Sequence, residues 1–377
     1  MDRFRIAIAS DWFAPRVGGI ELHLRDLARE LRARGHDVVV FTTVPGPSMV
    51  DGIPVHRMIV PMWPRLGVAQ PNLLRIPLVV RILRGLQPDL VHAHGTFSVA
   101  AIGMLIAGRY LGVPTITTHH SLLRGKAIGG ARAVYRVFSY RADLVSAVSQ
   151  AAAIDAREVS GREEVAILPN GIRPEAWYAT RVEPDDCHLV SVMRLTWTKS
   201  PQTIVRALPT IVSRLSGAAR VRLTIAGDGP DRASLEALAC HLGVADRVTF
   251  LGEVSRERLA VLFNGATAFV HTGEMEAFGL SVLEARCAGL PIVAMNHGAT
   301  PEIVEHQRSG LLANTTDELV DHVVRVASEP SLRRALGLAA REGVEQYAWD
   351  PVIARHVEVY RDTIQRFRRR RGLRRLV

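Results

Sequence analysis

Two glutamates, Glu276 and Glu284, flank a glycine that precedes a predicted helix. Apolar residues recur at helical spacing across 280–288, which predicts a helix over 281–288 and a loop that ends at Gly279. One carboxylate therefore stands before the helix and the other stands inside it. Acidic residues in such a pair could act together on a single ligand.

The start of this helix could bind a phosphate through its backbone alone. A helix N-terminus offers unpaired N–H groups and the positive end of the helix dipole. Gly279 has no Cβ to block an approaching oxygen. Glu276 and Glu284 would accept hydrogen bonds from hydroxyl groups of the same ligand, because both oxygens of a carboxylate are acceptors. This chemistry suits a nucleotide-sugar, and the alternative is an ordinary capped helix with a solvated Glu284.

Two cations, Arg194 and Lys199, follow a predicted strand at 189–193. Cations at a strand end suit a diphosphate, the arginine through its planar fork and the lysine as a point charge. A solvated basic loop is the alternative interpretation. A Gly-Asp-Gly-Pro turn at 227–230 follows the next predicted strand, at 221–226.

A glycine pair, Gly18 and Gly19, lies between a predicted strand at 4–9 and a helical pattern that begins at Ile20. Glycines at a helix start let the backbone come close to a phosphate or a sugar, and Glu21 would lie in the first turn. The dinucleotide-binding fingerprint is absent, because the glycines are adjacent and no third one follows. A tight turn without a ligand is the alternative.

Four histidines, His92, His94, His119 and His120, fall at the ends of two predicted strands. The carboxyl ends of parallel strands are where ligands collect in α/β sheets, and the glycine pair falls at the same edge. A single histidine is more often structural than catalytic. Four at two neighbouring strand ends favour a functional role for at least one of them.

Strands and helices alternate along the chain, which predicts parallel sheets with helices on both faces. The pattern restarts after an irregular stretch near residue 183. We therefore predict an α/β fold with two facing Rossmann-like domains, at 1–182 and 183–348, that leave one cleft between them. The remaining residues, 349–377, would form a last helix at 352–365 and a basic tail.

The composition supports two folded domains. The 377 residues, 48% of them hydrophobic, suffice for two cores of ordinary size. No apolar run reaches the roughly 18 residues that cross a bilayer, and the first apolar run is too short for a signal peptide, so we expect a cytoplasmic protein. The cysteines Cys187, Cys240 and Cys287 lack metal-ligand spacing and are predicted to be core thiols in a reducing compartment.

The segment Arg366–Arg375 carries seven arginines and no acidic residue, within a chain of formal net charge +10. A basic tail indicates contact with an anionic polymer or surface. Because Phe367, Leu373 and Leu376 are interleaved, an anionic membrane face fits better than nucleic acid, which would require a basic stripe through the folded part. The protein would then be peripheral on the inner membrane face, and a disordered tail is the alternative.

Together these motifs resemble the family 4 retaining glycosyltransferases of GT-B architecture. The resemblance runs from about residue 4 to about residue 360 and covers nearly the whole chain. Five signatures carry it: Gly18-Gly19-Ile20-Glu21, Pro169-Asn170-Gly171, Arg194 with Lys199, Gly227-Asp228-Gly229-Pro230, and Glu276 with Glu284.

The resemblance implies a donor site for a nucleotide-diphosphate sugar. Arg194 and Lys199 would hold the donor diphosphate and help it to leave. Glu276 would bind hydroxyls of the donor sugar, and Glu284 would bind the ribose. The other donor contacts would come from Gly18, Gly19, Gly229 and the backbone at Phe278, Gly279 and Leu280.

The resemblance also implies an active-site histidine and an acceptor site. His120, six residues after Pro114, matches the family histidine better than His119 does. The acceptor would contact His94, His119 and Arg124. The family needs no metal and no bound cofactor, which agrees with the lack of an Asp-x-Asp run near the proposed cleft. A C-terminal helix would cross back to the first domain.

Further stretches, Asp11–Pro15, His92–Gly95 and Thr118–Leu122, resemble the catalytic subunit of phosphatidylinositol N-acetylglucosaminyltransferase. Bacterial phosphatidylinositol mannosyltransferases are the other near relatives. Unlike that catalytic subunit, this sequence shows no membrane-spanning helix and ends in arginines. The resemblance implies a lipid-linked or inositol-phosphate acceptor at the membrane surface, with a hexose or N-acetylhexosamine transferred from a UDP-sugar or GDP-mannose.

The reaction implied is transfer with retention of the anomeric configuration. The acceptor hydroxyl would attack from the face that the diphosphate leaves, and a covalent role for Glu276 is the weaker alternative. Two other functions stay open: a nucleotide-sugar 2-epimerase of the same fold, and a nucleotide-sugar-binding subunit without catalysis. A dehydrogenase is the least favoured, since the cofactor fingerprint is missing.

Overall fold

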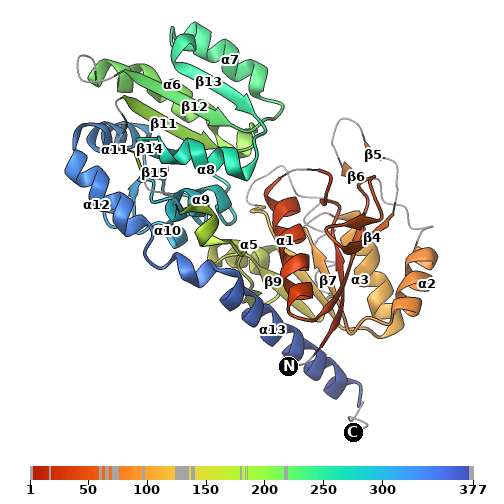
Figure 1. The fold of residues 1–377 in the computed structure, drawn as a ribbon. Helices are drawn as coiled ribbons and strands as arrows, with labels where there is room; N and C mark the ends of the chain where they lie inside the picture. Colours follow the sequence, from red (N-terminus) through yellow and green to blue (C-terminus); the bar gives the residue numbers. More distant parts are fainter. Residues whose placement is uncertain are drawn as a thin grey trace. The chain divides into compact units, whose positions relative to one another are not determined.

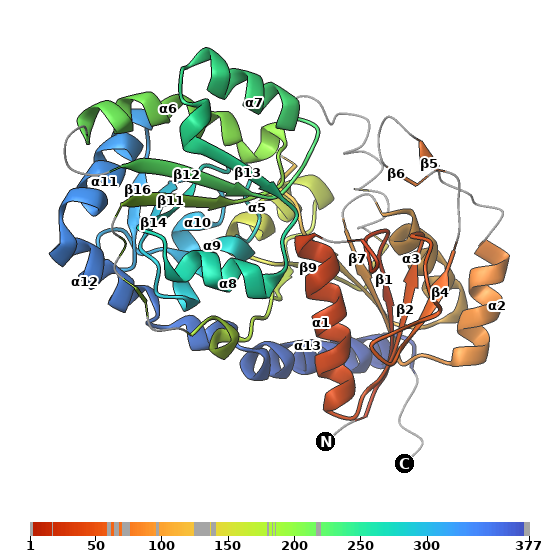
Figure 2. The ribbon, with the colours of Figure 1, turned by 45° about the horizontal axis from the view of Figure 1, so that its top comes forward.

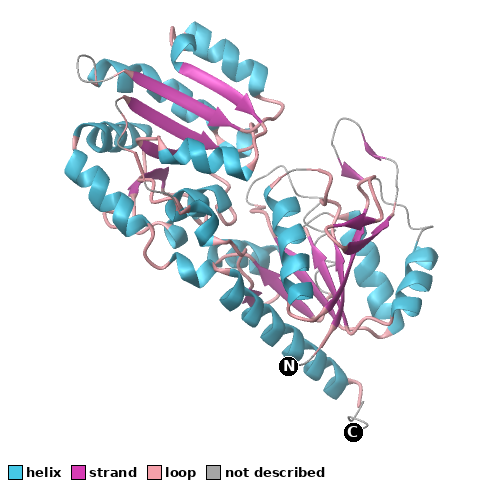
Figure 3. Cartoon of the chain, viewed as in Figure 1, coloured by secondary structure: helices cyan, strands magenta, loops and turns pink. Residues whose placement is uncertain are grey.

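The structure is a computed structural model of the chain, shown by sequence colour in Figure 1 and by secondary structure in Figure 3. It describes residues 3–16, 18–58, 62–63, 68–69, 76–95, 98–123, 136, 141–178, 181–182, 184, 186–215 and 220–372.

The chain forms two compact units. Unit 1 comprises residues 1–171 together with 349–377, and unit 2 comprises residues 172–348. Each unit is a parallel sheet covered by helices, as the alternating pattern of the sequence predicts.

The boundary between the first and the second domain comes earlier in the chain than the predicted residue 182. Residues 172–182, which the sequence analysis assigns to the first domain, group with unit 2. Ile172 forms a backbone bridge with Ala348, and the ring of Trp177 lies 5.7 Å from that of Phe263. These contacts join residues far apart in the sequence, and the irregular composition near residue 183 does not reveal them.

Unit 1 contains an eight-stranded sheet in the order β10-β9-β8-β7-β1-β2-β4-β3. All neighbouring strands are parallel except β3 and β4. Its inner strands are nearly continuous apolar runs, as expected for strands covered on both faces. The strands are β1 (Arg5–Ala9), β2 (Asp37–Thr42), β3 (Met49–Val50), β4 (Ile53–Arg57), β7 (Leu90–His94), β8 (Thr115–His119), β9 (Leu144–Ala147) and β10 (Val165–Ile167), with a separate antiparallel pair, β5 (Met62–Trp63) and β6 (Val68–Ala69).

Helices cover both faces of this sheet because successive residues of a strand point to opposite sides. Ile6 and Ile8 of β1 share a core with α1 and α13, whereas Ala7 and Ala9 share one with α2 and α3. Figure 2 shows α1 in front of the strands. The helices of this unit are α1 (Gly19–Ala33), α2 (Ile76–Leu86), α3 (Val99–Leu111), α5 (Gln150–Ser160) and α13 (Trp349–Arg370).

The last helix, α13, is longer than the predicted 352–365. It begins at Trp349 because Pro351 falls in its first turn, where a missing N–H group is tolerated. The Trp349 ring lies against the backbone of Gly171, where an added Cβ would come within 2.4 Å of the ring. The glycine of the Pro-Asn-Gly motif therefore makes room for the start of α13.

The helix α13 runs along the sheet in the direction opposite to the strands. Its first residue, Trp349, packs beside Gly171, which follows the end of β10. Near its other end, Arg366 Nη1 pairs with Glu164 Oε1 at 2.9 Å, just before β10 begins. The apolar start of α13 thus lies where the strands end, and its basic end lies where they begin.

Unit 2 contains a six-stranded parallel sheet in the order β13-β12-β11-β14-β15-β16. The strands are β11 (Cys187–Val192), β12 (Val221–Ala226), β13 (Val248–Gly252), β14 (Ala268–His271), β15 (Ile292–Met295) and β16 (Leu311–Ala313). The helices are α6 (Pro201–Arg214), α7 (Arg232–His241), α8 (Arg256–Asn264), α9 (Leu280–Cys287), α10 (Thr300–Ile303), α11 (Thr316–Ser328) and α12 (Pro330–Ala340). Apolar residues of α6 and α11 pack with β11 and β12 in one core.

One prediction about the cysteines is wrong. Cys187 and Cys287 are buried, and burial raises the pKa of each thiol to about 12, but Cys240 is exposed. The buried positions of α7 are Leu235 and Ala239, so the residue after Ala239 faces solvent. A cysteine on an amphipathic helix need not belong to the core.

Both sheets have a point at which the strand order reverses. In unit 1 the chain moves outward from β1 in one direction and from β7 in the other, and in unit 2 the same holds for β11 and β14. Ligands of open α/β sheets bind outside the carboxyl ends of the strands at such a point. The residues that follow these four strands therefore define where a site is expected.

Candidate functional site

The switch point of unit 2 brings together two residues that the sequence analysis names for one site. Lys199 lies in the short helix η4 (Trp197–Lys199) after β11, and Glu276 lies in the loop after β14. Lys199 Nζ is 2.6 Å from Glu276 Oε2. Thr198 also accepts a hydrogen bond from the N–H of Met275, at 3.2 Å, so the backbones of the two loops are joined as well.

His271 completes this group and was not predicted. It ends β14, is buried, and has its Nε2 3.4 Å from Glu276 Oε2. Burial on its own would raise the pKa of Glu276, but Lys199 and His271 outweigh it and hold that pKa well below its usual value. Glu276 is therefore an anion that accepts hydrogen bonds. A histidine at the end of a buried strand, just before the acidic loop, is the signal that sequence reasoning missed.

Two glycines let these loops come so close. A Cβ on Gly273 would lie 2.8 Å from His271 Nε2, and a Cβ on Gly298 would lie 2.3 Å from the carbonyl oxygen of Glu276. Gly298 also has a φ of +58°, in the region that favours glycine. The N–H of Ala299 donates to the Glu276 carbonyl at 2.9 Å, so the loop after β15 holds the Glu276 backbone.

Arg194 lies in the loop after β11, is exposed, and forms no ion pair with any residue that the structure describes. Its loop is held by the Gly-Asp-Gly-Pro turn, because the N–H of Leu195 donates to the carbonyl of Asp228 at 3.0 Å. A Cβ on Gly229 would lie 2.2 Å from the Leu195 carbonyl oxygen. Gly229 therefore permits the close approach that positions the Arg194 loop.

The helix α9 begins after Gly279, which has a φ of +95°. No side chain caps this N-terminus, and within the described residues the N–H of half-buried Leu280 has no recorded acceptor. The N–H of buried Phe278 instead points to Glu276 Oε1 at 3.5 Å. The start of α9 is thus open to an anion, while the amide of Phe278 is already turned toward the carboxylate.

Glu284 lies inside α9 and is buried, with its Oε1 3.7 Å from Nε of Arg256. Arg256 is the first residue of α8. The alternative in which Glu284 is simply solvated is therefore wrong. We call the residues Arg194, Lys199, His271, Glu276 and Glu284 the ionic site.

In unit 1 Asp11, two residues after β1, closes part of the switch point. Asp11 accepts hydrogen bonds from the N–H groups of Val99 at 2.6 Å and Ala100 at 3.0 Å, and from the hydroxyl of Thr43 at 3.0 Å. Burial raises the pKa of Asp11, although these hydrogen bonds partly offset the effect. The N-terminus of α3 is therefore occupied by this carboxyl group.

Gly18 and Gly19 lie at the start of α1, where no side-chain cap is present. The carboxylate of Glu21 lies over Gly18, and a Cβ added there would be 2.4 Å from Glu21 Oε2. Arg16 Nε holds the other carboxylate oxygen at 3.1 Å. An anion that approached this helix start would meet Glu21, which already lies at the positive end of the helix dipole.

Five buried histidines gather where β7 and β8 end and on the helices that cover them, and we call them the histidine cluster. Its members are His23, His92, His94, His120 and His356. His94 Nδ1 and His120 Nε2 are 2.9 Å apart and form a hydrogen bond. His94 Nε2 is buried and has no hydrogen-bond partner among the described residues. The rings of His23 and Trp349 stack at 5.8 Å.

Four of these histidines, His92, His94, His120 and His356, are uncharged at neutral pH. Burial lowers the pKa of His92 and His94 well below the usual value, that of His120 to about 3 and that of His356 to about 4. Neighbouring histidines lower the first three further. Each neutral ring then has one N–H donor and one acceptor nitrogen.

The structure does not bring His119 to this cluster. Its Nε2 is 3.0 Å from Asp155 Oδ2, and both side chains are fully buried. Neighbouring residues of a strand point to opposite faces, so His119 faces α5 when His120 faces His94. The same Asp155 oxygen accepts the N–H of Leu123 at 2.8 Å. Arg124, predicted to contact the acceptor, lies outside the described residues.

The basic end of α13 is helical up to Arg370. The side chains Arg368 to Arg371 are exposed, and the guanidinium of Arg371 lies 4.9 Å from the Phe367 ring centre. Arg374 and Arg375 lie outside the described residues. Across the part of the chain that the structure describes, no helix is long and apolar enough to cross a membrane.

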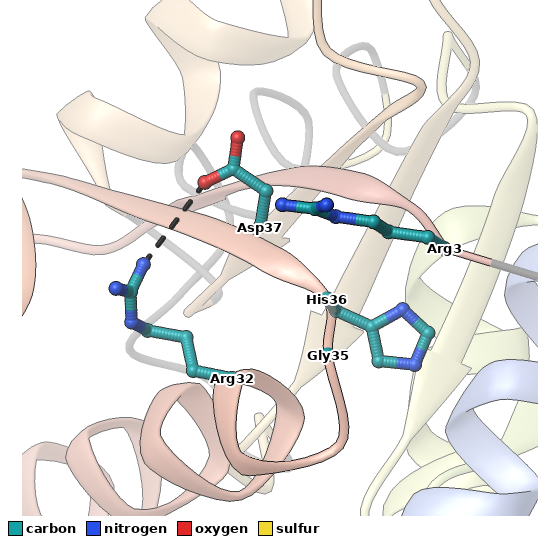
Figure 4. A pocket seen from close by; sticks show the side chains of 5 residues that line it. All are labelled: Arg3, Arg32, Gly35, His36 and Asp37. Carbon is teal, nitrogen blue, oxygen red and sulfur yellow. Dashed lines mark ion pairs between the residues drawn. The ribbon is translucent and has the colours of Figure 1, made fainter.

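A surface pocket of unit 1 lies away from the carboxyl ends of the strands. Arg3, Arg32, Gly35, His36 and Asp37 line it, and Figure 4 shows the ion pair of Arg32 with Asp37 at its rim. These residues precede β1 and β2 or begin them, at the edge of the sheet opposite to the strand ends. Its position gives no support for a substrate site.

No metal centre is evident in the residues that the structure describes. Among them, no group of three or more His, Cys, Asp or Glu side chains is arranged to hold a metal ion.

Two parallel sheets covered by helices, each with a switch point lined by polar side chains, are the architecture of the GT-B glycosyltransferases. The model of glycosyl transferases group 1 matches residues 179–343, and the model of glycosyltransferase family 4 matches residues 17–176. The chain belongs to the group 1, family 4 glycosyltransferases and is an enzyme of that class.

Relatives and solved structures agree with this assignment. The chain is 30% identical to a GDP-mannose-dependent alpha-mannosyltransferase of Mycobacterium tuberculosis, covering 93% of this chain and 94% of that protein. It is 26% identical to the gpi3 subunit of phosphatidylinositol N-acetylglucosaminyltransferase of Schizosaccharomyces pombe, covering 94% and 79%. Anabaena HepE in complex with UDP-glucose has the same fold, with a TM-score of 0.80 at 21% identity, covering 96% and 100%.

Proposed function

We propose that the protein transfers a hexose or an N-acetylhexosamine from a nucleotide-diphosphate sugar to a hydroxyl group, with retention of the anomeric configuration. The observation that carries this proposal is the Lys199–Glu276 pair at the switch point of unit 2, beside an open helix N-terminus. The named relatives act with GDP-mannose or transfer N-acetylglucosamine, and HepE was solved with UDP-glucose. A UDP-sugar or GDP-mannose is the donor class that these relatives suggest.

The donor diphosphate would be held by Arg194 and Lys199. A lysine ammonium has three N–H donors, and Glu276 takes one of them, so two remain for diphosphate oxygens. Arg194 has no ion pair within the described residues and can offer its guanidinium fork. Both cations would offset the negative charge that develops on the diphosphate as it leaves.

Glu276 would bind hydroxyls of the donor sugar. Lys199 and His271 hold its pKa low, and a carboxylate of low basicity is a better hydrogen-bond acceptor than nucleophile. We therefore favour attack by the acceptor hydroxyl from the face that the diphosphate leaves, with the diphosphate taking the proton. Glu284 would bind the ribose, and the start of α9, at Phe278, Gly279 and Leu280, would contact sugar and phosphate.

The histidine cluster would serve the reacting hydroxyl. His120 is the proposed catalytic histidine, and His94 is its partner in a hydrogen bond. A neutral imidazole can donate to or accept from a hydroxyl without adding a charge that would have to be balanced. Gly18 and Gly19 would contact the donor or the acceptor from the start of α1.

The acceptor is proposed to be lipid-linked or an inositol phosphate. This part rests on the phosphatidylinositol-linked activity in the name of the fission yeast relative, which covers most of this chain. A phosphatidylinositol headgroup offers several hydroxyls and one phosphodiester. Soluble inositol phosphate and phosphatidylinositol vesicles, tested side by side, separate the headgroup from the lipid as the recognised part.

The exposed arginines of α13 are proposed to contact an anionic membrane surface and to make the protein peripheral there. They lie at the edge of the sheet where strands begin, away from the His94–His120 pair. Replacing Arg368, Arg369 and Arg370, together with the adjoining Arg371, by Gln should therefore weaken binding to phosphatidylserine vesicles by up to about 1000-fold, because each basic residue contributes about 1 kcal/mol near an anionic surface. Transfer to a soluble acceptor should not change.

We propose that the reaction needs no metal and no bound cofactor. In this proposal Arg194 and Lys199 would neutralise the diphosphate in place of a metal ion. Turnover in excess EDTA should equal turnover without it. A loss that added Mg²⁺ or Mn²⁺ restores would contradict this part of the proposal.

The experiment that tests the proposed function is a donor panel with acceptors. UDP-N-acetylglucosamine, UDP-glucose, UDP-galactose and GDP-mannose are incubated with each acceptor, and NMR reads the anomeric configuration of the product. One donor should yield a product of the same configuration as the donor. Release of nucleotide and a changed sugar without acceptor would favour the 2-epimerase, and tight donor binding without any turnover would favour the non-catalytic subunit.

A further inference from the structure

Tyr360 links the C-terminal helix to the histidine cluster. It lies in α13, is fully buried, and its Oη is 2.7 Å from His92 Nδ1 on β7. His92 and Tyr360 are 268 positions apart in the chain. This contact engages one ring nitrogen of His92, which lies next to His94 and His356 in the cluster.

The hydrogen bonds continue from His92 across the sheet. His92 Nε2 is 2.6 Å from Thr118 Oγ1 on β8, and Thr118 Oγ1 is 2.7 Å from Ser146 Oγ on β9. Ser146 Oγ is in turn 3.3 Å from the carbonyl oxygen of Thr117. One chain of hydrogen bonds therefore joins a helix to three adjacent strands.

Counting protons gives this chain a direction. A carbonyl oxygen only accepts, so the Thr117 carbonyl, 3.3 Å from Ser146 Oγ, is available for the single hydroxyl proton of Ser146, and we take the proton to point there. The proton between Thr118 and Ser146 must then come from Thr118, which leaves the Thr118 oxygen to accept from His92 Nε2–H. His92 Nδ1 is consequently a lone pair that accepts the hydroxyl proton of Tyr360. If the hydrogen bonds ran the other way, His92 Nδ1–H would donate to Tyr360 Oη. The hydroxyl proton of Tyr360 would then have no acceptor among the described residues.

The charge states agree with this direction. Burial raises the pKa of Tyr360, so the residue stays a phenol that can donate. Burial lowers the pKa of His92 well below the usual value, and the histidines His356 and His120 lower it further, so the ring is neutral. A neutral ring with its proton on Nε2 is the form that the chain of hydrogen bonds requires.

The orientation of His92 is passed on to the proposed catalytic pair. His92 and His94 lie on the same face of β7, and their ring centres are only 3.9 Å apart. His94 in turn holds His120 through the 2.9 Å hydrogen bond. The His92 ring is hydrogen-bonded at both nitrogens and cannot rotate. The His94 ring therefore packs against a neighbour of fixed orientation.

We propose that Tyr360 is a positioning residue for the His94–His120 pair: by donating to His92 it sets the tautomer and the ring orientation of His92, and it ties the packing of α13 to the geometry of the pair. The link to transfer rests on the proposed function of His120. The link to the ring geometry rests on the contacts of unit 1 alone.

The test compares Tyr360→Phe with Thr363→Val. Thr363 is a buried residue of the same helix. Among the described residues its hydroxyl bonds only the backbone of that helix, at the Val359 carbonyl at 2.8 Å, so its variant controls for the loss of a buried hydroxyl. Nitrogen-15 NMR of labelled histidines reports the tautomer of His92 and the environments of His94 and His120. Turnover and donor KM are measured on the same samples.

The wild type should show His92 protonated at Nε2. Tyr360→Phe should mix the two tautomers, shift the His94 and His120 signals, and lower kcat by about tenfold with an unchanged donor KM, because a small misplacement of a catalytic group is enough for such a loss. Thr363→Val should leave the His92 tautomer, the His94 and His120 signals and kcat unchanged. Unshifted His94 and His120 signals in Tyr360→Phe would overturn the proposal.

A second pair of variants covers a failure of Tyr360→Phe to fold. Thr118→Val breaks the chain at its other end and should reproduce the NMR shifts, whereas Thr118→Ser keeps the hydroxyl and should restore the wild-type signals. Equal shifts in both would mean that packing and not the hydrogen bond positions the pair. If no donor supports transfer, the proposed function fails, and the NMR arm still decides the positioning role.

Discussion

The two switch points of this molecule are built from opposite chemistry. In unit 2 the side chains are charged and paired, with Lys199 on Glu276 and Arg256 near Glu284. In unit 1 the corresponding place holds buried, neutral histidines that bond to one another and to hydroxyls. The same parallel-sheet architecture thus supports an ionic site in one unit and a cluster of neutral histidines in the other.

The difference follows from what each site is proposed to handle. A diphosphate brings negative charge that only cations or backbone dipoles can offset. An acceptor hydroxyl is neutral, and a neutral imidazole can bind it without an unbalanced charge in a buried place. We therefore expect changes to the cations of unit 2 to act on donor binding and changes to Glu276 to act on the donor sugar, whereas changes to the histidines of unit 1 act on transfer.

The largest effect is expected from the double variant Arg194→Ala with Lys199→Ala. Hydrogen bonds to charged groups contribute about 1.5–3 kcal/mol each, so the loss of both cations should weaken donor binding by about 1000-fold. Titration calorimetry with the donor chosen by the panel measures it. Arg325→Ala, which removes an exposed cation paired with Glu329 at the end of α11, is the matched control and should bind donor normally. Normal donor binding by the double variant would exclude Arg194 and Lys199 as the residues that hold the diphosphate.

Glu276→Gln should separate binding from turnover. The amide keeps the shape but loses the charge that partly neutralises Lys199, so affinity for the free nucleoside diphosphate should stay equal or rise slightly. Transfer should fall by about 100-fold, because hydrogen bonds from the sugar hydroxyls to a carboxylate are stronger than those to an amide. Steady-state kinetics and nucleotide titration measure the two. Wild-type turnover would exclude both the hydroxyl-binding and the nucleophile role.

Azide distinguishes these two roles in the smaller variant Glu276→Ala. A nucleophilic glutamate predicts rescue by azide, with a glycosyl azide as product. Attack on the face that the diphosphate leaves predicts no rescue. Product analysis by NMR decides between them.

Stability should depend on pH through unit 1. His120 and His356 have pKa values lowered to about 3 and about 4, whereas the unfolded chain binds these protons near pH 6.5. Their contribution is therefore complete above pH 6.5 and is lost as the pH falls toward these values, by about 1.4 kcal/mol per pH unit for each histidine. Melting temperatures of the wild type and His356→Gln at pH 7.5 and 5.0 test this. A variant with an unchanged pH dependence would contradict the assignment.

The smallest effect is expected from Gly298→Ala in the loop that supports Glu276. The added Cβ would meet the Glu276 carbonyl at 2.3 Å, at a position where φ is +58°. The variant should lose about 1–3 kcal/mol of stability and move Glu276 away from Lys199. Gly243→Ala, with a φ of +68° and no nearby atoms, controls for backbone strain alone. Equal donor affinity in the two variants would show that the loop does not position Glu276.

Local patterns were enough to predict the elements and the strand ends. The helix at Leu280 and the strands before Lys199 and His94 follow from short-range periodicity, and parallel sheets then gather their carboxyl ends. The resemblance to family 4 enzymes added the roles and the idea of a returning helix. None of these steps required knowledge of contacts between distant residues.

The parts that sequence reasoning missed depend on distant packing. The contact of His271 with Glu276 and that of Tyr360 with His92 join residues whose own neighbours give no sign of it. His119 was grouped with His120 although one step along a strand reverses the face. The start of α13 was placed too late because Pro351 resembled a break, yet a proline is tolerated in a first turn.

The most direct test of the contrast between the two sites is the donor affinity of His120→Ala, measured by titration calorimetry beside its transfer rate. Donor affinity should equal that of the wild type, and transfer should fall at least 100-fold, because the histidine cluster is proposed to serve the acceptor hydroxyl and the ionic site to hold the donor. Loss of donor binding, or wild-type transfer, would contradict that division.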